Sequence, residues 1–252
     1  MKEGGCLKKL GKIFLGLLVI LGLISVGSYY YLKENTYEPS KTALTTSKKA
    51  IDNKEYLFFK SPKKKLAQQH PIIIFYPGAL VEPESYSVWA NKLSETGYDV
   101  AIVKMPLNLA ILDKNRAEKV IEDFPDRTFV FGGHSLGGVM SSRYVSQNVT
   151  DKNKGIFFLA SYPDKKGALS QSKIPVLSIT ASKDQVLNHE AYEEAKQYLP
   201  AQTKYVVING GNHSGFGAYG EQKKDGEAEI TNEDQQIALV NTIENWLKQN
   251  GW

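Results

Sequence analysis

The chain has 252 residues, 42% hydrophobic and 23% charged, which is the composition of a globular protein and excludes a disordered or fibrous one. The formal net charge is only +4, and three of those charges lie in residues 1–12, so no nucleic-acid partner is expected. The single cysteine, Cys6, excludes an internal disulfide.

Residues 13–32 form an uncharged run of 20 residues, and a helix of about 20 apolar residues spans the core of a bilayer. Lysines precede the run and three consecutive tyrosines, 29–31, lie at its far end. This polarity favours a single-pass anchor in the cell membrane, with a cytoplasmic basic tail at 1–12 and an extracytoplasmic remainder. A signal segment cleaved near residues 25–28, which would release a secreted protein, is the open alternative.

Residues 33–55 are polar and are interpreted as a linker before a domain at 56–252. In that domain, β-branched and aromatic runs alternate with helical patterns. The predicted strands are 56–60, 71–76, 98–104, 127–132, 155–161, 175–182 and 204–210. The predicted helices are 84–96, 115–124, 135–148, 189–199 and 232–249. The alternation predicts an α/β fold, a mostly parallel twisted sheet with helices on both faces. Ligands of such sheets bind at the carboxyl ends of the strands.

A candidate nucleophile, Ser135, follows the strand 127–132 and opens the next helix, in the pattern Gly133-His134-Ser135-Leu136-Gly137. A sharp strand-to-helix turn strains the serine, and the glycines remove side chains that would collide there. The turn lifts the hydroxyl away from the sheet, and the helix N-terminus offers free N–H groups to a developing oxyanion. The pattern therefore predicts a nucleophilic serine.

A serine hydroxyl needs a base, and the base needs an orienting acid. His213 follows the strand 204–210 on a glycine-rich loop and is the candidate base. Asp184 follows the strand 175–182 and is the candidate acid, although it could equally cap the next helix; Asp164 is the second choice. The remaining histidines are expected to be structural or solvated: His70, His134 and His189.

The order Ser135, Asp184, His213 after a G-x-S-x-G turn resembles the α/β-hydrolase superfamily over about residues 56–249. The chain is similar in particular to the compact bacterial group called α/β-hydrolase fold-5, related to dienelactone-hydrolase-like enzymes. Those enzymes use a cysteine nucleophile, so their substrate is not implied for this serine. The similarity is carried by YPGALVEPESY (76–86), VAIVKMPLNLA (100–110), GGHSLGG (132–138), ASKDQV (181–186) and GGNHSGFGAYG (210–220).

The resemblance implies an oxyanion hole made of two backbone N–H groups. One belongs to Leu136, directly after the nucleophile, and the other to Ala79 or its neighbour Leu80. The superfamily has a His-Gly pair in this second loop, whereas this chain has Pro77-Gly78, a change that leaves the backbone donor in place.

The segment between Ser161 and Ile174 is too short for a helical lid, so the site is expected to be open. Four residues that follow strand ends are candidates for contact with the acyl part of a substrate: Leu80, Met105, Phe216 and Tyr219. The spacing of His, Cys and Asp residues fits no metal site, and acyl transfer needs no cofactor.

Together these features predict a membrane-anchored serine hydrolase that cleaves carboxylic esters of small or medium acyl substrates. Two alternatives stay open: an acyltransferase to an envelope acceptor, which uses the same residues, and a non-catalytic envelope binding module on a hydrolase fold.

Overall fold

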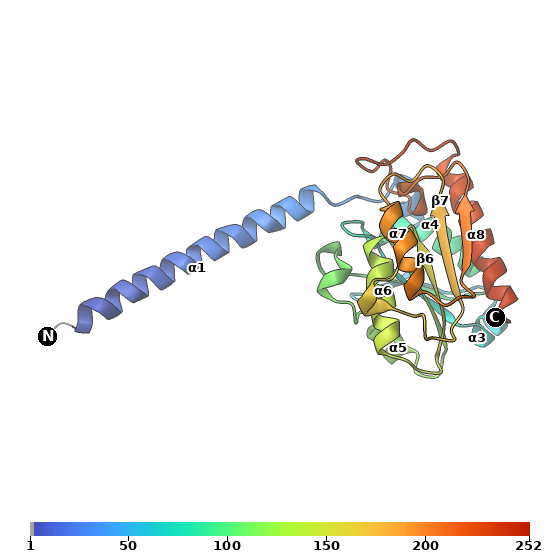
Figure 1. Cartoon of the computed structure of the whole chain (residues 1–252), viewed down its shortest axis with the longest axis horizontal. Coiled ribbons are helices and arrows are strands. Elements are labelled where there is room, and N and C mark those ends of the chain that lie inside the picture. Colours follow the sequence, from blue (N-terminus) through green and yellow to red (C-terminus); the bar gives the residue numbers. More distant parts are fainter. Residues whose placement is uncertain (1–2) are drawn as a thin grey trace. The chain divides into compact units, whose positions relative to one another are not determined.

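The computed structural model describes residues 3–252, apart from the side chains of residues 3–13, 15, 16, 19, 24 and 25. It contains two compact units, Met1–Thr36 and Tyr37–Trp252. The first unit holds helix α1, Glu3–Glu34, which includes the predicted anchor 13–32 (Figure 1). Within the described residues, no helix combines the length and the apolar character needed to cross a membrane. That statement does not cover the six side chains of the run 13–32 that are not described, and the role of this run as an anchor stays a prediction.

The second unit is built on an eight-stranded sheet in the order β1-β2-β4-β3-β5-β6-β7-β8. The strands are β1 Ile51–Asp52, β2 Tyr56–Phe59, β3 Ile72–Tyr76, β4 Val100–Val103, β5 Phe129–His134, β6 Asn153–Leu159, β7 Val176–Ala181 and β8 Lys204–Ile208. β1 and β2 pair antiparallel, as do β2 and β4, and every other neighbouring pair is parallel. The predicted α/β fold with a mostly parallel sheet is confirmed, and each of the seven predicted strands overlaps one of the strands β2 to β8.

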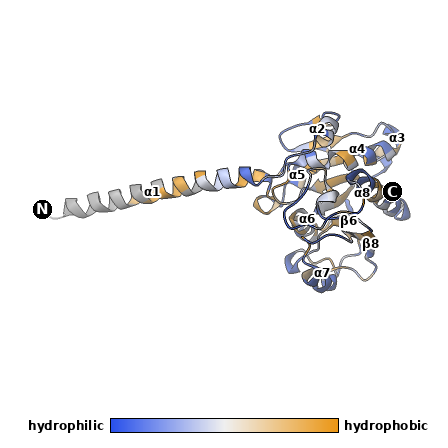
Figure 2. Ribbon diagram, turned by 90° about the horizontal axis from the view of Figure 1, so that it is seen from above, coloured by the Kyte–Doolittle hydropathy of each residue, from blue (hydrophilic) through white to orange (hydrophobic). Residues whose placement is uncertain are grey.

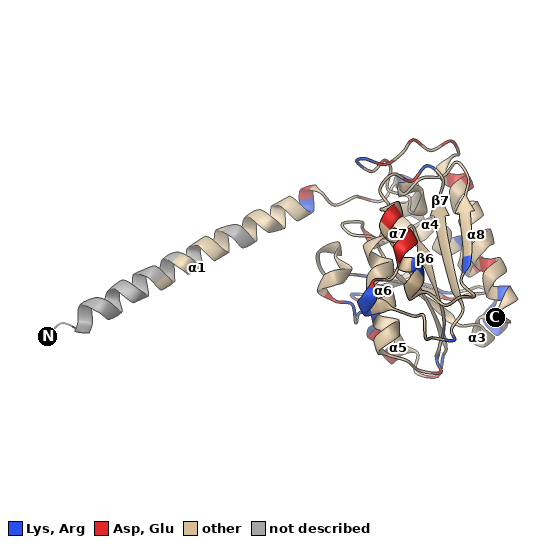
Figure 3. Cartoon of the chain, viewed as in Figure 1, with Lys and Arg blue, Asp and Glu red and all other residues tan. Residues whose placement is uncertain are grey.

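Helices cover both faces of this sheet. They are α2 Lys41–Ser47, α3 Lys64–Gln69, α4 Ser87–Thr96, α5 Ala117–Asp123, α6 Leu136–Gln147, α7 His189–Ala195 and α8 Asn232–Gln249. Short 3₁₀ turns are η1 Pro83–Tyr86, η2 Pro106–Asn108, η3 Ala110–Leu112, η4 Lys165–Gly167, η5 Lys196–Tyr198 and η6 Ser214–Phe216. Basic and acidic residues are interspersed over these elements (Figure 3).

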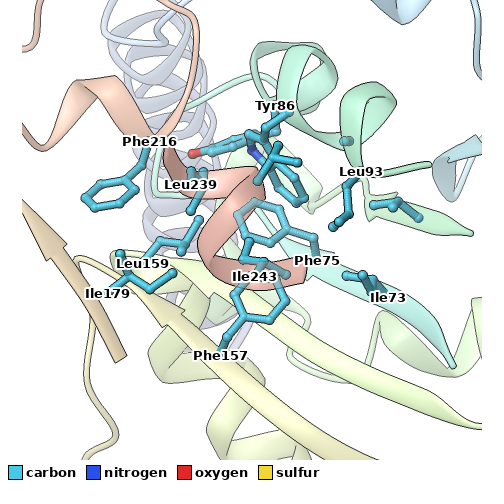
Figure 4. Packing of buried hydrophobic residues seen from close by; sticks show 14 of the residues in the cluster. Ile73, Phe75, Tyr86, Leu93, Phe157, Leu159, Ile179, Phe216, Leu239 and Ile243 are labelled. Carbon is cyan, nitrogen blue, oxygen red and sulfur yellow. The ribbon is translucent and has the colours of Figure 1, made fainter. Parts of the chain in front are cut away.

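Two hydrophobic cores lie on the two faces of the sheet. One packs α4 and α8 against the strands through residues such as Leu93 and Ile243 (Figure 4). The other packs α5 and α6 through residues such as Val120 and Tyr144. Because both faces are covered, β3, β4 and β5 are buried along their whole length, which explains their continuous apolar runs. Helix α3, in which Ala67 is the buried residue, is largely hydrophilic (Figure 2).

The predicted linker 33–55 is only partly a linker, because the second unit begins at Tyr37. Tyr37 pairs with Val81 in an isolated parallel bridge, and α2 packs against α4. Ser40 caps α2 by accepting the Ala43 N–H. The sequence reading missed α2 because a seven-residue helix that buries only Ala43 and Ser47 has almost no apolar periodicity.

The order of the sheet places two loops at a topological switch point. β3 has β4 on one side and β5 on the other, and Tyr76 at the end of β3 pairs with Gly133 near the end of β5. The loops that follow β3 and β5 therefore leave the same edge side by side, in the position where open α/β sheets bind ligands.

Candidate active site

Ser135 lies between β5 and α6 in a strained backbone conformation, with φ 50° and ψ −125°. Non-glycine residues rarely adopt a positive φ, and such strain persists only where surrounding bonds hold it. Here the Ser135 N–H donates to the Leu159 carbonyl at 3.0 Å, and the Ser161 hydroxyl donates to the Ser135 carbonyl at 2.6 Å. Both partners belong to β6 or follow it, so β6 holds the turn in place.

The glycines of this serine turn, residues 133–137, are required by close approach. A Cβ on Gly133 would lie 2.5 Å from the carbonyl carbon of Gly137. A Cβ on Gly137 would lie 2.3 Å from the carbonyl oxygens of Tyr76 and Pro77. The first turn of α6 therefore packs directly on the end of β3, which brings Ser135 close to the loop that follows β3.

Asp184 and His213 are hydrogen-bonded to each other. Asp184 follows β7 and His213 follows β8, and Asp184 Oδ2 lies 2.8 Å from His213 Nδ1. Their side chains are 0% and 2% exposed, so the pair is shielded from water. Asp184 Oδ1 also accepts the N–H groups of Val186 and Leu187 at 2.9 and 2.8 Å. The Asp184 carboxylate thus bonds both a local turn and the imidazole, and this leaves His213 Nε2 as the nitrogen that can accept a proton. Asp184 does not cap the next helix, because the N-cap of α7 is Asn188, which accepts the Ala191 N–H.

The candidate nucleophile Ser135 is not hydrogen-bonded to the candidate base His213. The Ser135 hydroxyl makes no hydrogen bond within the part of the chain that the structure describes. The His213 ring nevertheless lies beside the residue that precedes the serine, with 4.5 Å between the ring centroids of His134 and His213. Such contacts are often long before a substrate binds, so the arrangement stays compatible with a Ser-His pair.

His134 belongs to a buried network with the loop after β3. Its Nδ1 lies 2.9 Å from the Tyr86 hydroxyl, and that hydroxyl accepts the Gly78 N–H at 2.9 Å. Burial raises the pKa of Tyr86 and lowers the pKa of His134 well below 6.5, so both groups are neutral. The single Tyr86 proton then goes to His134 Nδ1, and His134 carries its own proton on Nε2, a buried atom without a hydrogen-bond partner among the described residues.

The backbone N–H groups near Ser135 differ in availability. The Leu80 N–H donates to the Asn108 carbonyl at 2.8 Å, and the Gly78 N–H is taken by Tyr86. Those of Ala79 and Leu136 have no partner in the described part of the chain. The sequence left Ala79 and Leu80 as alternatives for the second oxyanion-hole donor, and of these two only Ala79 has a free N–H.

Three of the four predicted acyl contacts are core residues. Phe216 is 0% exposed and Tyr219 7%, both in the core beside α4 and α8, and Met105 is 6% exposed in the core beside α6. Their apolar character is accounted for by packing, and they present almost no surface to a ligand. Leu80 is half-buried and is the one of the four that keeps exposed surface at this edge.

The alternative residues are engaged elsewhere. Asp164 forms an ion pair with Arg143, whose guanidinium lowers the pKa of that carboxyl, and it also caps η4. His70 bonds the Gly97 carbonyl and stacks on Tyr98 at the opposite edge of the sheet. His189 is exposed on α7 and bonds the Asp184 carbonyl at 3.0 Å.

The sequence reading missed the residues that support the His213 loop. Asp225 accepts the N–H groups of Ser214 and His213 at 2.8 and 3.3 Å. Gln235 and Gln236 of α8 are buried and bond the loop backbone between residues 212 and 217. Two adjacent glutamines on the inner side of an amphipathic helix were the available signal, because buried amides need partners.

A sequence model of the alpha/beta hydrolase family matches residues 72–237, more than half of the chain. The chain belongs to the alpha/beta hydrolase family. The matched region of this hydrolase runs from β3 into α8 and includes Ser135, Asp184 and His213. Among curated proteins, none matches the hydrolase in sequence.

Solved structures share the fold at low identity. An alpha/beta hydrolase from the sediment metagenome of the Mar Chica lagoon, Morocco, has a TM-score of 0.58 and 12% identity, covering 81% of this chain and 99% of that one. A soluble variant of monoglyceride lipase from Saccharomyces cerevisiae has a TM-score of 0.57 and 12% identity, covering 79% and 94%. A membrane phospholipase A, a bacterial virulence factor, has a TM-score of 0.58 and 11% identity, covering 95% and 99%. These similarities show that the chain shares the α/β-hydrolase fold with these structures.

Proposed function

We propose that this hydrolase is a membrane-anchored, extracytoplasmic serine esterase that cleaves carboxylic esters through Ser135, His213 and Asp184. The observation that carries the proposal is the buried 2.8 Å bond between Asp184 and His213, at the sheet edge where Ser135 is held at φ 50°. The serine, the aspartate and the histidine follow three different strands. A strained serine together with an imidazole oriented by a carboxylate is the arrangement used in nucleophilic catalysis.

In the acylation step, His213 Nε2 takes the proton of the Ser135 hydroxyl while Oγ attacks the ester carbonyl. The carbonyl oxygen becomes an oxyanion that accepts the free N–H groups of Ala79 and Leu136. The tetrahedral intermediate then breaks its bond to the alcohol oxygen, which receives the proton from the His213 imidazolium. Asp184 stabilises that imidazolium and holds its Nδ1–H inward.

In the deacylation step, His213 removes a proton from water, which attacks the acyl carbon. The bond to Ser135 Oγ breaks, the serine recovers its proton and the carboxylic acid leaves. Apart from the ester and water, every group that takes part in the proposed cycle is a side chain or a backbone amide of this chain.

The membrane part of the proposal comes from the run 13–32, with its preceding lysines and following tyrosines. Its location stays a prediction that a fractionation experiment tests. The chain, carrying a C-terminal tag, is expected in the membrane fraction and accessible to protease added outside the cytoplasmic membrane. Release into the medium of a form lacking residues 1–28 would instead establish the cleaved-signal alternative.

The catalytic proposal is tested with a fluorophosphonate probe on the full chain, followed by intact mass. One adduct is expected on the wild type and none on Ser135→Ala or His213→Ala. His70→Asn is the matched histidine control, because it keeps a polar group opposite the Gly97 carbonyl at the far edge of the sheet. It should label like the wild type. No adduct on a folded wild type would overturn the proposal and leave a binding role for the fold.

A further inference from the structure

A group of exposed apolar side chains lies on the segment that follows β4. Leu107 is 48% exposed, Ile111 57% and Leu112 55%. Single exposed apolar residues are ordinary, but here three large ones lie within six positions of one loop, and clustered exposed apolar residues mark interaction sites. We call these three residues the apolar rim.

The apolar rim is tied to the loop that carries the free Ala79 N–H. Asn108, next to Leu107, accepts the Leu80 N–H at 2.8 Å. Leu80, Leu107 and Asn108 all have positive φ values, of 57°, 51° and 55°. Three strained non-glycine residues at one contact cost stability, and such strain is typical of functional loops. The backbone conformation at Leu107 and Asn108, next to the rest of the apolar rim, is therefore held by the contact with Leu80.

A third segment joins the same edge. Tyr37 donates its N–H to the Leu80 carbonyl at 2.7 Å, and its own carbonyl accepts the Glu82 N–H at 3.1 Å. Leu80 thus bonds Asn108 through its N–H and Tyr37 through its carbonyl. Tyr37 is also the first residue of the hydrolase unit, five positions after the uncharged run ends at Leu32. The chain from Leu32 to Tyr37 spans at most about 18 Å, so an anchor at 13–32 would tether Tyr37 within that distance of its own end.

We propose that the apolar rim enters the lipid interface and that the substrate is a lipid ester taken from the bilayer. The inference rests on the proposed function, because it uses the Ser135 site and the anchor at 13–32. Side chains such as Ile111 and Leu112 lose exposed apolar area when they enter lipid, and this favours a bilayer over water. The rim would then place an ester group of the membrane beside Ala79 and Ser135.

The chemistry stays that of acyl transfer. The acyl carbon of the lipid bonds to Ser135 Oγ, the ester C–O bond breaks, and the departing lysolipid alcohol takes the proton from His213. Water then releases the fatty acid.

The experiment compares two substrates on the full chain. One is lipid in vesicles of phosphatidylcholine and phosphatidylglycerol, measured by fatty acid release, and the other is a water-soluble short-chain nitrophenyl ester. The test variant is Ile111→Ser with Leu112→Ser. The matched control is Val149→Ser with Val207→Ser, two exposed residues outside the rim, after α6 and on β8.

The test variant is expected to lose about tenfold or more in vesicle turnover, since it removes apolar area that would be buried in lipid. Its short-ester turnover should stay within about twofold, as for ordinary surface changes. The control variant should stay within about twofold on both substrates. Equal losses on the two substrates, or no loss on vesicles, would overturn the inference. A changed oligomeric state of the test variant would overturn it too, because the rim would then be a subunit interface.

A direct probe of depth completes the test. Tryptophan in place of Ile111 should be quenched by brominated phospholipid, whereas tryptophan in place of Val149 should not; equal quenching at both positions contradicts the proposal. Labelling by the fluorophosphonate probe distinguishes failure of the lipid-substrate inference from failure of the proposed esterase function. A wild type that labels and cleaves the short ester but not vesicle lipid refutes only the lipid substrate. A wild type that neither labels nor cleaves either ester refutes the proposed function itself.

Discussion

The buried hydroxyl of Tyr86 offers the sharpest test of how the site is held together, through the variant Tyr86→Phe. The substitution removes one oxygen atom from a side chain that is 0% exposed and keeps the ring in the core. Two groups lose their partner at once, the Gly78 N–H and His134 Nδ1, each 2.9 Å from that oxygen. No water reaches a fully buried side chain without rearrangement, so both groups stay unsatisfied.

The size of the effect follows from these two losses. A buried polar group without a partner costs about 1–3 kcal/mol, and two neighbouring groups that relax together should cost about 2–4 kcal/mol. For a domain of this size, that lowers the melting temperature by about 5–15 °C. Gly78 also precedes Ala79, so a looser Gly78 should lower kcat for a short ester more than it changes KM.

The assay is thermal and denaturant unfolding of the full chain, with kcat and KM measured below the transition. Tyr98→Phe is the matched control, because its hydroxyl makes one bond, to the Trp252 carbonyl, at the other edge of the sheet. It should cost about 0.5–1.5 kcal/mol and leave kcat unchanged. If Tyr86→Phe is no more destabilising than Tyr98→Phe, the two-bond network and the tautomer inferred for His134 are refuted.

Three further predictions concern titratable side chains. Asp184→Asn keeps an Oδ1 acceptor for the local turn but should lower kcat/KM for a short ester by about 10⁴. Asp164→Asn should leave kcat/KM within about twofold of the wild type. The reverse result would make Asp164 the acid. Asp225→Ala frees two N–H groups of the His213 loop and should lower the free energy of unfolding by about 1–3 kcal/mol, measured by urea unfolding; an unchanged midpoint would refute its supporting role. Burial holds the folded-state pKa of His134 well below 6.5, so below about pH 6.5 the unfolded chain binds a proton at His134 that the folded chain does not. His134 therefore lowers the free energy of unfolding as the pH falls below about 6.5, by up to about 1.4 kcal/mol per pH unit. Urea unfolding from pH 7.5 to 5 should show a shallower dependence in His134→Gln, and equal slopes would contradict the neutral assignment.

Much of the fold was predictable because its signals are local. Continuous apolar runs such as residues 71–76 mark strands covered on both faces, and the helix 232–249 was predicted with the bounds that α8 has in the structure. Ser135 was identifiable for the same reason, since the predicted strand, the glycine-flanked turn and the predicted helix follow one another within the 22 residues 127–148. The boundary of the domain was predicted less well, because α2 and the Tyr37 bridge are held by tertiary contacts and show little periodicity.

The sequence by itself determined which residue types stand at the strand ends, and so the candidates Ser135, Asp184 and His213, because strand and turn propensities act over a few residues. Only the tertiary structure decided how those candidates are connected. It left the Ala79 N–H free by pairing Leu80 with Asn108, and it joined Tyr86 to His134 across 48 positions. A hydrogen bond depends on the distance between two atoms in space, and that distance is set by packing of elements far apart along the chain.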